Sequence, residues 1–407
     1  MPPAPSQRPS PPQGLDKIAH VVIVVQENRS FDNLFHGFPG ADTVSSGLRH
    51  AGGTYSLLPA SLTAADIDHQ IHSFLVAWDG GKMDGFDIED PTQAPTRPYG
   101  YVPQSEVQPY WDLASSYALN DRTFASQIDS SFTAHQYLIA AQTGGTVGTP
   151  TATPWGCDAP PSTTIPILLP GRVIGPGVFP CFSYPTIATE LDAAGLPWRY
   201  YAPSISNGNG GALWGAFDAI RAVRYGPDWT TDVIDPETDF LGDAQRGVLP
   251  AVSWVIPDFI NSDHAGSGSS SGPDWVASVV NAVGTGPDWS TTAIFVVWDD
   301  WGGWYDHVPP PQLDLHGLGI RVPLIVISPY AKRGFVSHQQ TEFGSLLRFV
   351  EDRFGLAQLS DSDRRASVPY DCFDFSQAPR AFSQIQTRRS IKYFLTQRPS
   401  GRALDNE

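Results

Sequence analysis

The sequence lacks any apolar run that approaches the roughly 20 residues of a membrane span, and it is poor in cysteine and in basic residues. Its three cysteines include no pair spaced as C-x-x-C, so a zinc ribbon is not expected. Lys and Arg number 25 against 42 Asp and Glu, which gives a formal net charge of −17. This balance argues against electrostatic binding to nucleic acid or to an anionic membrane.

What is present is enough for a large folded domain. The 407 residues are 41% hydrophobic and 12% aromatic, which allows a sizeable core. Residues 1–14 are rich in Pro and Ser and predict a disordered N-terminal stub, with residues 15–407 as one domain. Glycine and proline number 38 each, so long loops are expected.

Cys157 and Cys181 bracket a segment rich in Pro and Gly, while Cys372 lies far along the chain. Two interpretations are open for the pair, a disulfide or two buried thiols, and the disulfide is favoured. Closing a loop of this length would stabilise the fold by roughly 3 kcal/mol. A disulfide suits an exported protein, so we expect a periplasmic or secreted location with Cys372 as a free thiol.

The chain is organised around Ala293–His307, AIFVVWDDWGGWYDH. The apolar run before Asp299 and Asp300 indicates a strand buried on both faces, as in a parallel sheet. Ligands of open α/β sheets bind just beyond the carboxyl ends of the strands. Paired carboxylates there repel each other unless a cation or proton lies between them. The alternative is an acidic turn exposed to solvent.

A second stretch repeats the pattern. In His20–Asp32, HVVIVVQENRSFD, a β-branched run ends at Glu27 and Asn28. Two strand ends that each provide two oxygen ligands could close one metal site. Oxygen ligands favour Mg²⁺, Ca²⁺ or Mn²⁺ over Zn²⁺. The alternative for Asn28 is a helix N-cap, and both can hold at once.

These segments together resemble a known family. The motifs are QENRSFDNLFHGFPG, GGKMDGF, WDDWGGWYDHVPPP, RVPLIVISPYAKRGFVSH and SLLRFVEDRFGL, in this order between about Lys17 and Leu356. They are similar to the bacterial phosphoesterase family of phosphatidylcholine-type phospholipases C and acid phosphatases. The resemblance implies an alkaline-phosphatase-like α/β fold, with a mostly parallel central sheet and helices on both faces. The alternation of β and α patterns independently favours such a fold.

The resemblance also implies site residues. It places a hydroxyl nucleophile at Thr133, with Ser130 and Ser131 as weaker candidates, and the alternative for Thr133 is a helix cap. It favours His69 and His264 as phosphate-binding residues. His307 is either a partner behind the metal ligands or a structural cap.

The chain departs from the family pattern at two places. The phospholipases have Thr-His-Pro-Asn-Arg where this chain has Thr133-Ala134-His135-Gln136-Tyr137. Relatives often have Asp-His where this chain has Glu342-Phe343, so a second metal or base from that histidine is not expected. The larger phospholipases also carry C-terminal β domains, for which this sequence has no room.

The sequence therefore predicts a metal-dependent phosphoric ester hydrolase that works through a phosphoryl-enzyme. An acid-phosphatase-like enzyme with a small phosphomonoester substrate is favoured. Phospholipase C activity on a phospholipid head group is the alternative, and a phosphate-binding protein without activity is an alternative of another class. One divalent metal is expected, with no further cofactor, no nucleic-acid partner and no membrane span.

The secondary-structure pattern places the candidate residues. Helices are expected at 67–78, 186–194, 272–283 and 342–353, with a turn feeding a helix at 130–145. Strands are expected at 21–25, 198–202, 251–256, 294–298 and 323–328, and a strand or loop at 117–127. Flexible loops are expected at 51–66 and 207–211.

Overall fold

The computed structural model describes residues 10–204 and 214–400. The loop expected at 207–211 and most of the N-terminal stub therefore lie outside the described residues. In the described part of the chain, a nine-stranded sheet runs in the order β10-β9-β11-β1-β12-β13-β6-β14, with β15 also paired to β6. The strands are β1 (His20–Gln26), β6 (Ala118–Phe124), β9 (Trp198–Tyr201), β10 (Val233–Ile234), β11 (Val252–Val255), β12 (Thr292–Trp298), β13 (Arg321–Ile327), β14 (Phe335–Ser337) and β15 (Thr341–Glu342).

The sheet is mostly parallel, which confirms the predicted fold class. β1 pairs in parallel with β11 on one side and with β12 on the other. β13 is the exception, since it runs antiparallel to both β12 and β6. An apolar run shows that a strand is buried but not which way it points, so the sequence did not reveal this reversal. All seven residues of β1's neighbour β12 are buried.

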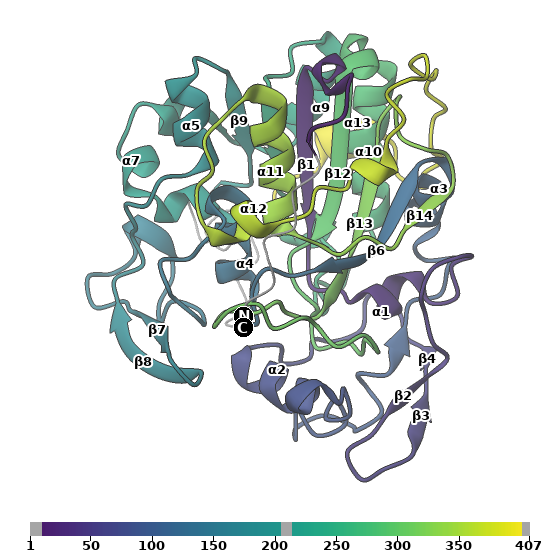
Figure 1. The fold of residues 1–407 in the computed structure, drawn as a ribbon, viewed down its shortest axis with the longest axis vertical. Coiled ribbons are helices and arrows are strands. Elements are labelled where there is room, and N and C mark those ends of the chain that lie inside the picture. The colour runs from purple at the N-terminus through teal and green to yellow at the C-terminus, as the bar shows by residue number, and fades with distance from the viewer. Residues whose placement is uncertain (1–9, 205–213, 401–407) are drawn as a thin grey trace.

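Helices cover both faces of the sheet (Figure 1). One face carries α3 (Gln108–Ser116), α9 (Asp239–Arg246), α10 (Gly272–Thr285) and α13 (Ile391–Thr396). α10 contacts each of the other three helices, and it also contacts β12. The other face carries α4 (Ser131–Ala140), α5 (Ile187–Ala193), α11 (Phe343–Phe354) and α12 (Asp361–Arg365). The apolar side chains of both layers and of the central strands form one large buried core.

Shorter elements lie beyond the carboxyl edge of the sheet, at the bottom of Figure 1. They are α1 (Phe31–Phe35), α2 (Ile71–Trp78), β2 (Ser46–Leu48), β3 (Thr54–Ser56), β4 (Leu58–Pro59), β5 (Gly100–Tyr101), β7 (Ile165–Leu169) and β8 (Val173–Val178). The segment at 51–66, expected to be loop, thus contains two short strands. The helix expected from residue 67 begins at Ile71, where the Asp129 carboxylate accepts the first backbone N–H.

Two further helices follow, of which α8 (Asp228–Thr231) contacts β10 and α7 (Arg221–Arg224) contacts α8. None of the helices in the described ranges combines the length and the hydropathy that a membrane span requires. The structure contains the predicted disulfide, with Cys157 and Cys181 bonded to each other. Cys372 is a buried free thiol, also as predicted.

Candidate active site

The register of β1 and β12 brings the two oxygen-bearing pairs together. Gln26 lies opposite Trp298, so the residues that follow the two strands leave the sheet side by side. The Asn28 backbone N–H donates to Asp299 Oδ1 at 2.9 Å, and the Arg29 N–H donates to the Asp300 carbonyl. Glu27, Asn28, Asp299 and Asp300 are all fully buried. The predicted ligand set is therefore assembled at one place.

The backbone at this place is tightly packed. Asn28 has a φ of 60°, a left-handed conformation that asparagine tolerates better than most residues. Gly302 has the same φ, and a Cβ on it would lie 2.1 Å from the Asn28 carbonyl oxygen. The Gly302 N–H donates to Asp300 Oδ1 at 2.8 Å. Glycine is needed at this turn for two reasons, its φ and the close approach of another backbone.

The helix α4 directs a hydroxyl into the acidic cluster. Ser131 is the first residue of α4, and its Oγ lies 3.4 Å from Glu27 Oε2, 3.5 Å from Asn28 Oδ1 and 3.4 Å from Asp300 Oδ2. A helix N-terminus carries partial positive charge, which stabilises an alkoxide or a phosphate there. Ser131 Oγ is thus placed as a nucleophile would be, beside acidic side chains and at the positive end of a helix.

Thr133 is oriented differently. Its Oγ1 donates to the Ser130 carbonyl at 3.0 Å, within the first turn of α4. Residues two apart on a helix project about 200° apart around its axis, because each residue turns the chain by about 100°. Ser131 and Thr133 therefore cannot face the same cluster, and the structure brings Ser131 to the acids. Ser130 is the N-cap residue, and its hydroxyl has no hydrogen-bond partner among the described residues.

Two predicted histidines meet at the same site. His69 Nδ1 donates to the Ile67 carbonyl at 2.7 Å, which leaves Nε2 to accept from Asn28 Nδ2 at 2.7 Å. This contact turns Asn28 Oδ1 toward Ser131. His264 Nδ1 donates to the Ala265 carbonyl at 2.5 Å, and the rings of His69 and His264 lie 6.2 Å apart. Each carbonyl contact fixes one ring nitrogen as the donor and directs the other away from the backbone.

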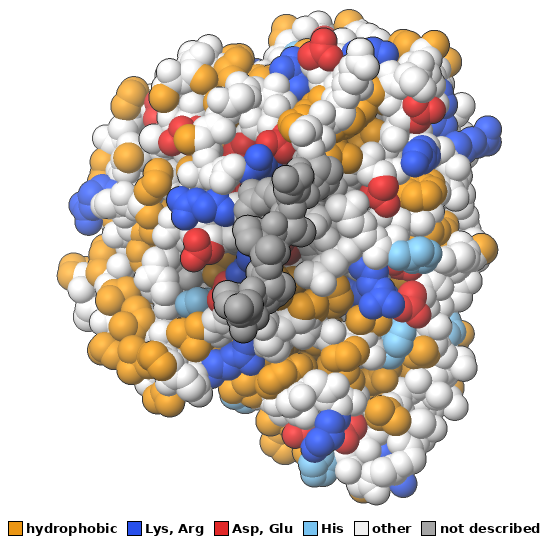
Figure 2. Space-filling view, in the orientation of Figure 1, with side chains coloured by type: hydrophobic (Ala, Val, Ile, Leu, Met, Phe, Trp, Pro, Cys, Tyr) orange, Lys and Arg blue, Asp and Glu red, His pale blue; other side chains and the backbone are white. Residues whose placement is uncertain are grey.

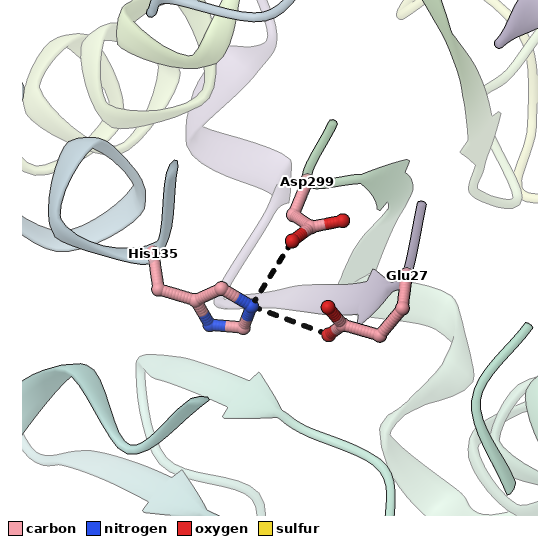
Figure 3. A group of neighbouring side chains, drawn as sticks. All are labelled: Glu27, His135 and Asp299. Atoms are coloured by element: carbon pink, nitrogen blue, oxygen red, sulfur yellow. Dashed lines mark hydrogen bonds and ion pairs between the residues drawn. The ribbon is translucent and has the colours of Figure 1, made fainter. Parts of the chain in front are cut away.

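His135 is a site residue that sequence reasoning missed. It follows Ser131 by four positions, so both lie on one face of α4. Its Nε2 lies 3.2 Å from Glu27 Oε1 and 3.7 Å from Asp299 Oδ2 (Figure 3). The spacing to Ser131 was the signal that could have found it. Trp214 lies nearby, with its ring 6.4 Å from that of His135 and 6.1 Å from that of His264.

His307 belongs to a neighbouring ion-pair network. Its Nδ1 lies 2.6 Å from Asp32 Oδ2, and its Nε2 lies 3.2 Å from Asp42 Oδ1. Arg321 is fully buried and pairs with both Asp32 and Asp306. Burial lowers the pKa of His307, but the hydrogen bond to Asp32 and the neighbouring carboxylates outweigh burial and raise this pKa above its ordinary value. These contacts hold the segment that follows Asn28. They do not place His307 beside Ser131.

Asp32, Asp306 and His307 also lie close enough to share a cation. The Arg321 guanidinium already supplies positive charge to both carboxylates. Burial, with Asp32 nearby, raises the pKa of Asp306 to about 6 against the opposing effect of Arg321. We therefore assign this group to structural support.

Two other residues of the sequence motifs lie outside the site. The exposed Lys82 ammonium pairs with Asp79 at 2.6 Å, as a solvated lysine would. The Glu342 carboxylate accepts from Ser126 at 2.9 Å and pairs with Arg365 at 2.8 Å. Glu342 also caps α11, so its position serves the packing of α11 against α12.

The donor set around Ser131 fits a divalent metal. A hydroxyl donating to a carboxylate normally lies about 2.7 Å from it, whereas Ser131 Oγ lies 3.4–3.5 Å from three oxygens. Ligands at about 2.1 Å from one ion, at tetrahedral angles, lie about 3.4 Å from each other. In addition, the buried Asp299 Oδ2 has no hydrogen-bond partner among the described residues. Spacing and charge together indicate a cation site.

A buried hydroxyl at a helix N-terminus, beside acidic residues and histidines, has the chemistry of a nucleophile that could attack an ester with the help of a bound cation. The comparisons with known proteins agree. The model of the Phosphoesterase family matches residues 18–357, and the chain belongs to this family. It is a phosphoric ester hydrolase.

Curated relatives extend over most of the chain. Phospholipase C A of Mycobacterium tuberculosis (strain H37Rv) is 27% identical over 443 residues, covering 91% of this chain and 80% of that protein. The non-hemolytic phospholipase C of Pseudomonas aeruginosa is 29% identical, covering 89% of this chain and 57% of that protein. Non-specific phospholipase C1 of Arabidopsis thaliana is 25% identical, and the match covers 92% of this chain and 74% of that protein.

Among solved structures, a protein in the alkaline phosphatase superfamily from Vibrio parahaemolyticus matches with a TM-score of 0.42 and 11% identity. The match covers 86% of this chain and 69% of that protein.

Proposed function

We propose that the chain hydrolyses phosphoric esters through Ser131, beside a divalent metal held by Glu27, Asn28, Asp299 and Asp300. The observation that carries this proposal is the position of Ser131 Oγ between Glu27, Asn28 and Asp300. Thr133, the nucleophile predicted from sequence, remains the competing candidate, although its hydroxyl is engaged by the Ser130 carbonyl.

In this proposal, Ser131 Oγ attacks phosphorus and the bond from phosphorus to the leaving alcohol breaks. A phosphoryl-enzyme forms, and water then cleaves it. A bound divalent metal would supply positive charge that lowers the pKa of the attacking hydroxyl and neutralises phosphoryl oxygens. The N-terminus of α4 adds partial positive charge at the same place.

The histidines take different roles because their hydrogen bonds differ. His69 donates to Ile67 through Nδ1 and accepts from Asn28 through Nε2, so it holds that ligand in position and has no ring N–H left to donate to phosphate. His264 Nδ1 is fixed as a donor to Ala265, so its Nε2 is the nitrogen that exchanges a proton with the leaving group. We propose His307 as a positioning residue that acts through Asp32.

For the substrate we propose a phospholipid, as in phospholipase C. The β7–β8 hairpin exposes four large apolar side chains: Leu169, Val173 and Ile174 lie near its turn, and Val178 lies at the far end of β8. Hydrophobic side chains gather at the lower left of Figure 2, where Figure 1 places β7 and β8. No acidic residue lies between Asp158 and Glu190 in this otherwise acidic chain. Such a surface suits the interface of a zwitterionic bilayer.

The sequence of β8 argues against pairing of this hairpin with a strand from another protein. β8 reads VIGPGV, and its central Pro176 cannot donate to an added strand. The hairpin is also connected to the nucleophile. Thr146 bridges to Ile167 of β7, and the neighbouring Gly148 N–H donates to Asp129, two residues before Ser131. A docked hairpin would thus hold the site next to the lipid.

An acid-phosphatase-like activity on small phosphomonoesters is the second candidate. The residues from Thr133 to Tyr137 differ from the Thr-His-Pro-Asn-Arg run of the phospholipases, and this difference favours the phosphatase. The disulfide supports a periplasmic or secreted location, since such bonds persist in oxidising compartments.

The test compares p-nitrophenyl phosphate, p-nitrophenyl phosphorylcholine and phosphatidylcholine vesicles. We expect turnover of the second and third. Turnover of the first alone would identify a phosphatase, and turnover of none of the three would contradict both candidates.

Val173→Ser tests the hairpin, with Val248→Ser as the matched control, because the two valines are 57% and 48% exposed. Burial of a valine contributes about 1.5 kcal/mol, so Val173→Ser should weaken vesicle binding about tenfold. Turnover of p-nitrophenyl phosphorylcholine should be unchanged in both variants. Equal vesicle binding by both variants would contradict docking through the hairpin.

A further inference from the structure

The two oxygens of the Glu27 carboxylate face different donors. Oε2 lies 3.4 Å from Ser131 Oγ, whereas Oε1 lies 3.2 Å from His135 Nε2. A carboxylate with one oxygen beside each of two groups of side chains has the geometry of a ligand that bridges two cations.

Asp299 completes the set on the His135 side. Its Oδ1 already accepts the backbone N–H groups of Asn28 and Asp300, at 2.9 and 2.8 Å. Its Oδ2 is fully buried, has no hydrogen-bond partner among the described residues, and lies 3.7 Å from His135 Nε2. Figure 3 shows the Asp299 and Glu27 oxygens converging on this nitrogen from two strands.

The spacing of these three atoms matches that of metal ligands. Bonds of about 2.1 Å place ligands about 3.0 Å apart at right angles and about 3.4 Å apart at tetrahedral angles. The observed 3.2 and 3.7 Å lie close to this range. The three groups are also buried together. A buried carboxylate oxygen without a partner costs free energy that a cation would remove.

We propose that Glu27 Oε1, His135 Nε2 and Asp299 Oδ2 form a second cation position, separate from the oxygen position beside Ser131. Imidazole nitrogen is a softer ligand than carboxylate oxygen, so this position favours Zn²⁺ or another transition metal over Mg²⁺ and Ca²⁺. The Glu342-Phe343 departure removes a histidine elsewhere and does not affect this one. The inference rests on the proposed metal site, with which the second position shares Glu27 and Asp299.

Two other arrangements of these residues would need no second cation. A protonated His135 would itself supply the positive charge between Glu27 and Asp299, in place of a cation. A single ion that uses His135 as one of its ligands would be a further alternative. Metal stoichiometry separates both from the proposal.

The experiment measures total bound metal, by elemental mass spectrometry after equilibrium dialysis of metal-free protein against Zn²⁺ together with Mn²⁺, which the oxygen position favours. Wild type should bind two equivalents and His135→Ala one. His72→Ala, which removes an exposed histidine that pairs with the nearby Asp68, should bind two. His135→Gln keeps the size of the side chain and should also bind one equivalent, which covers the case in which the alanine variant fails to fold.

Two results would overturn the proposal. Wild type with one equivalent would show that only one position exists, and His135→Ala with two equivalents would show that His135 is not a ligand. Absorption of the Co²⁺-loaded protein gives a second readout, because loss of a nitrogen ligand shifts the d–d bands in His135→Ala. Failure of the proposed hydrolase function would appear differently, as a wild-type protein that binds metal but turns over no ester.

Discussion

Gly302→Ala is the sharpest test of the packing that holds Asn28 in place. The new Cβ would lie 2.1 Å from the Asn28 carbonyl oxygen and 2.9 Å from its Cβ, both closer than atoms can approach. The φ of 60° adds strain for any residue with a Cβ. The left-handed conformation costs about 1–2 kcal/mol, and overpacking of a buried site costs about 1–3 kcal/mol more.

Gly195→Ala separates the two contributions. Gly195 has a φ of 67°, and a Cβ there would meet no atom within 4 Å, so only the conformational strain applies. Urea denaturation should therefore give a loss of about 1–2 kcal/mol for Gly195→Ala and about 2–5 kcal/mol for Gly302→Ala. Gly302→Ala should also weaken metal binding, because Asn28 must move. Equal stability of the two variants would refute the close packing of Gly302 on Asn28.

The remaining predictions concern stability. Reduction of the Cys157–Cys181 disulfide should lower the free energy of unfolding by about 3 kcal/mol, and non-reducing peptide mapping should recover the linked peptides; two free thiols would contradict the pairing. Burial, with the Asp363 carboxylate nearby, raises the pKa of Glu351 to about 10. Wild type should therefore lose stability relative to Glu351→Gln as pH rises from about 4.5, where the carboxyl titrates in the unfolded chain, to about 10. A stability difference between the two proteins that does not change with pH would contradict a buried neutral carboxyl.

The convergence of Glu27 and Asp299 was predictable because it depends only on strand ends. Glu27 and Asp299 each follow a long apolar run, and two neighbouring parallel strands deliver such residues to the same edge of a sheet. The direction of β13 was not predictable, because a buried run of apolar residues is the same whichever way the strand points.

The choice among hydroxyls was beyond the sequence for a related reason. Ser130, Ser131 and Thr133 all lie at the start of α4, and only the position at which the helix begins decides which of them faces the acids. A shift of one residue turns a side chain by about 100° around the helix axis. His135 was missed because the resemblance presented it only as a departure from another motif, although its spacing to Ser131 places both on one helix face.

Mass spectrometry of the enzyme quenched during turnover tests the central claim most directly. The account predicts a phosphoryl group on Ser131, absent in Ser131→Ala, with kcat/KM reduced by several powers of ten in that variant, where each factor of ten is about 1.4 kcal/mol of barrier. Thr133→Ala should keep most of its activity and lose only about 1 kcal/mol of stability with its hydrogen bond to Ser130. A phosphoryl group on Thr133, with Ser131→Ala still active, would contradict the account.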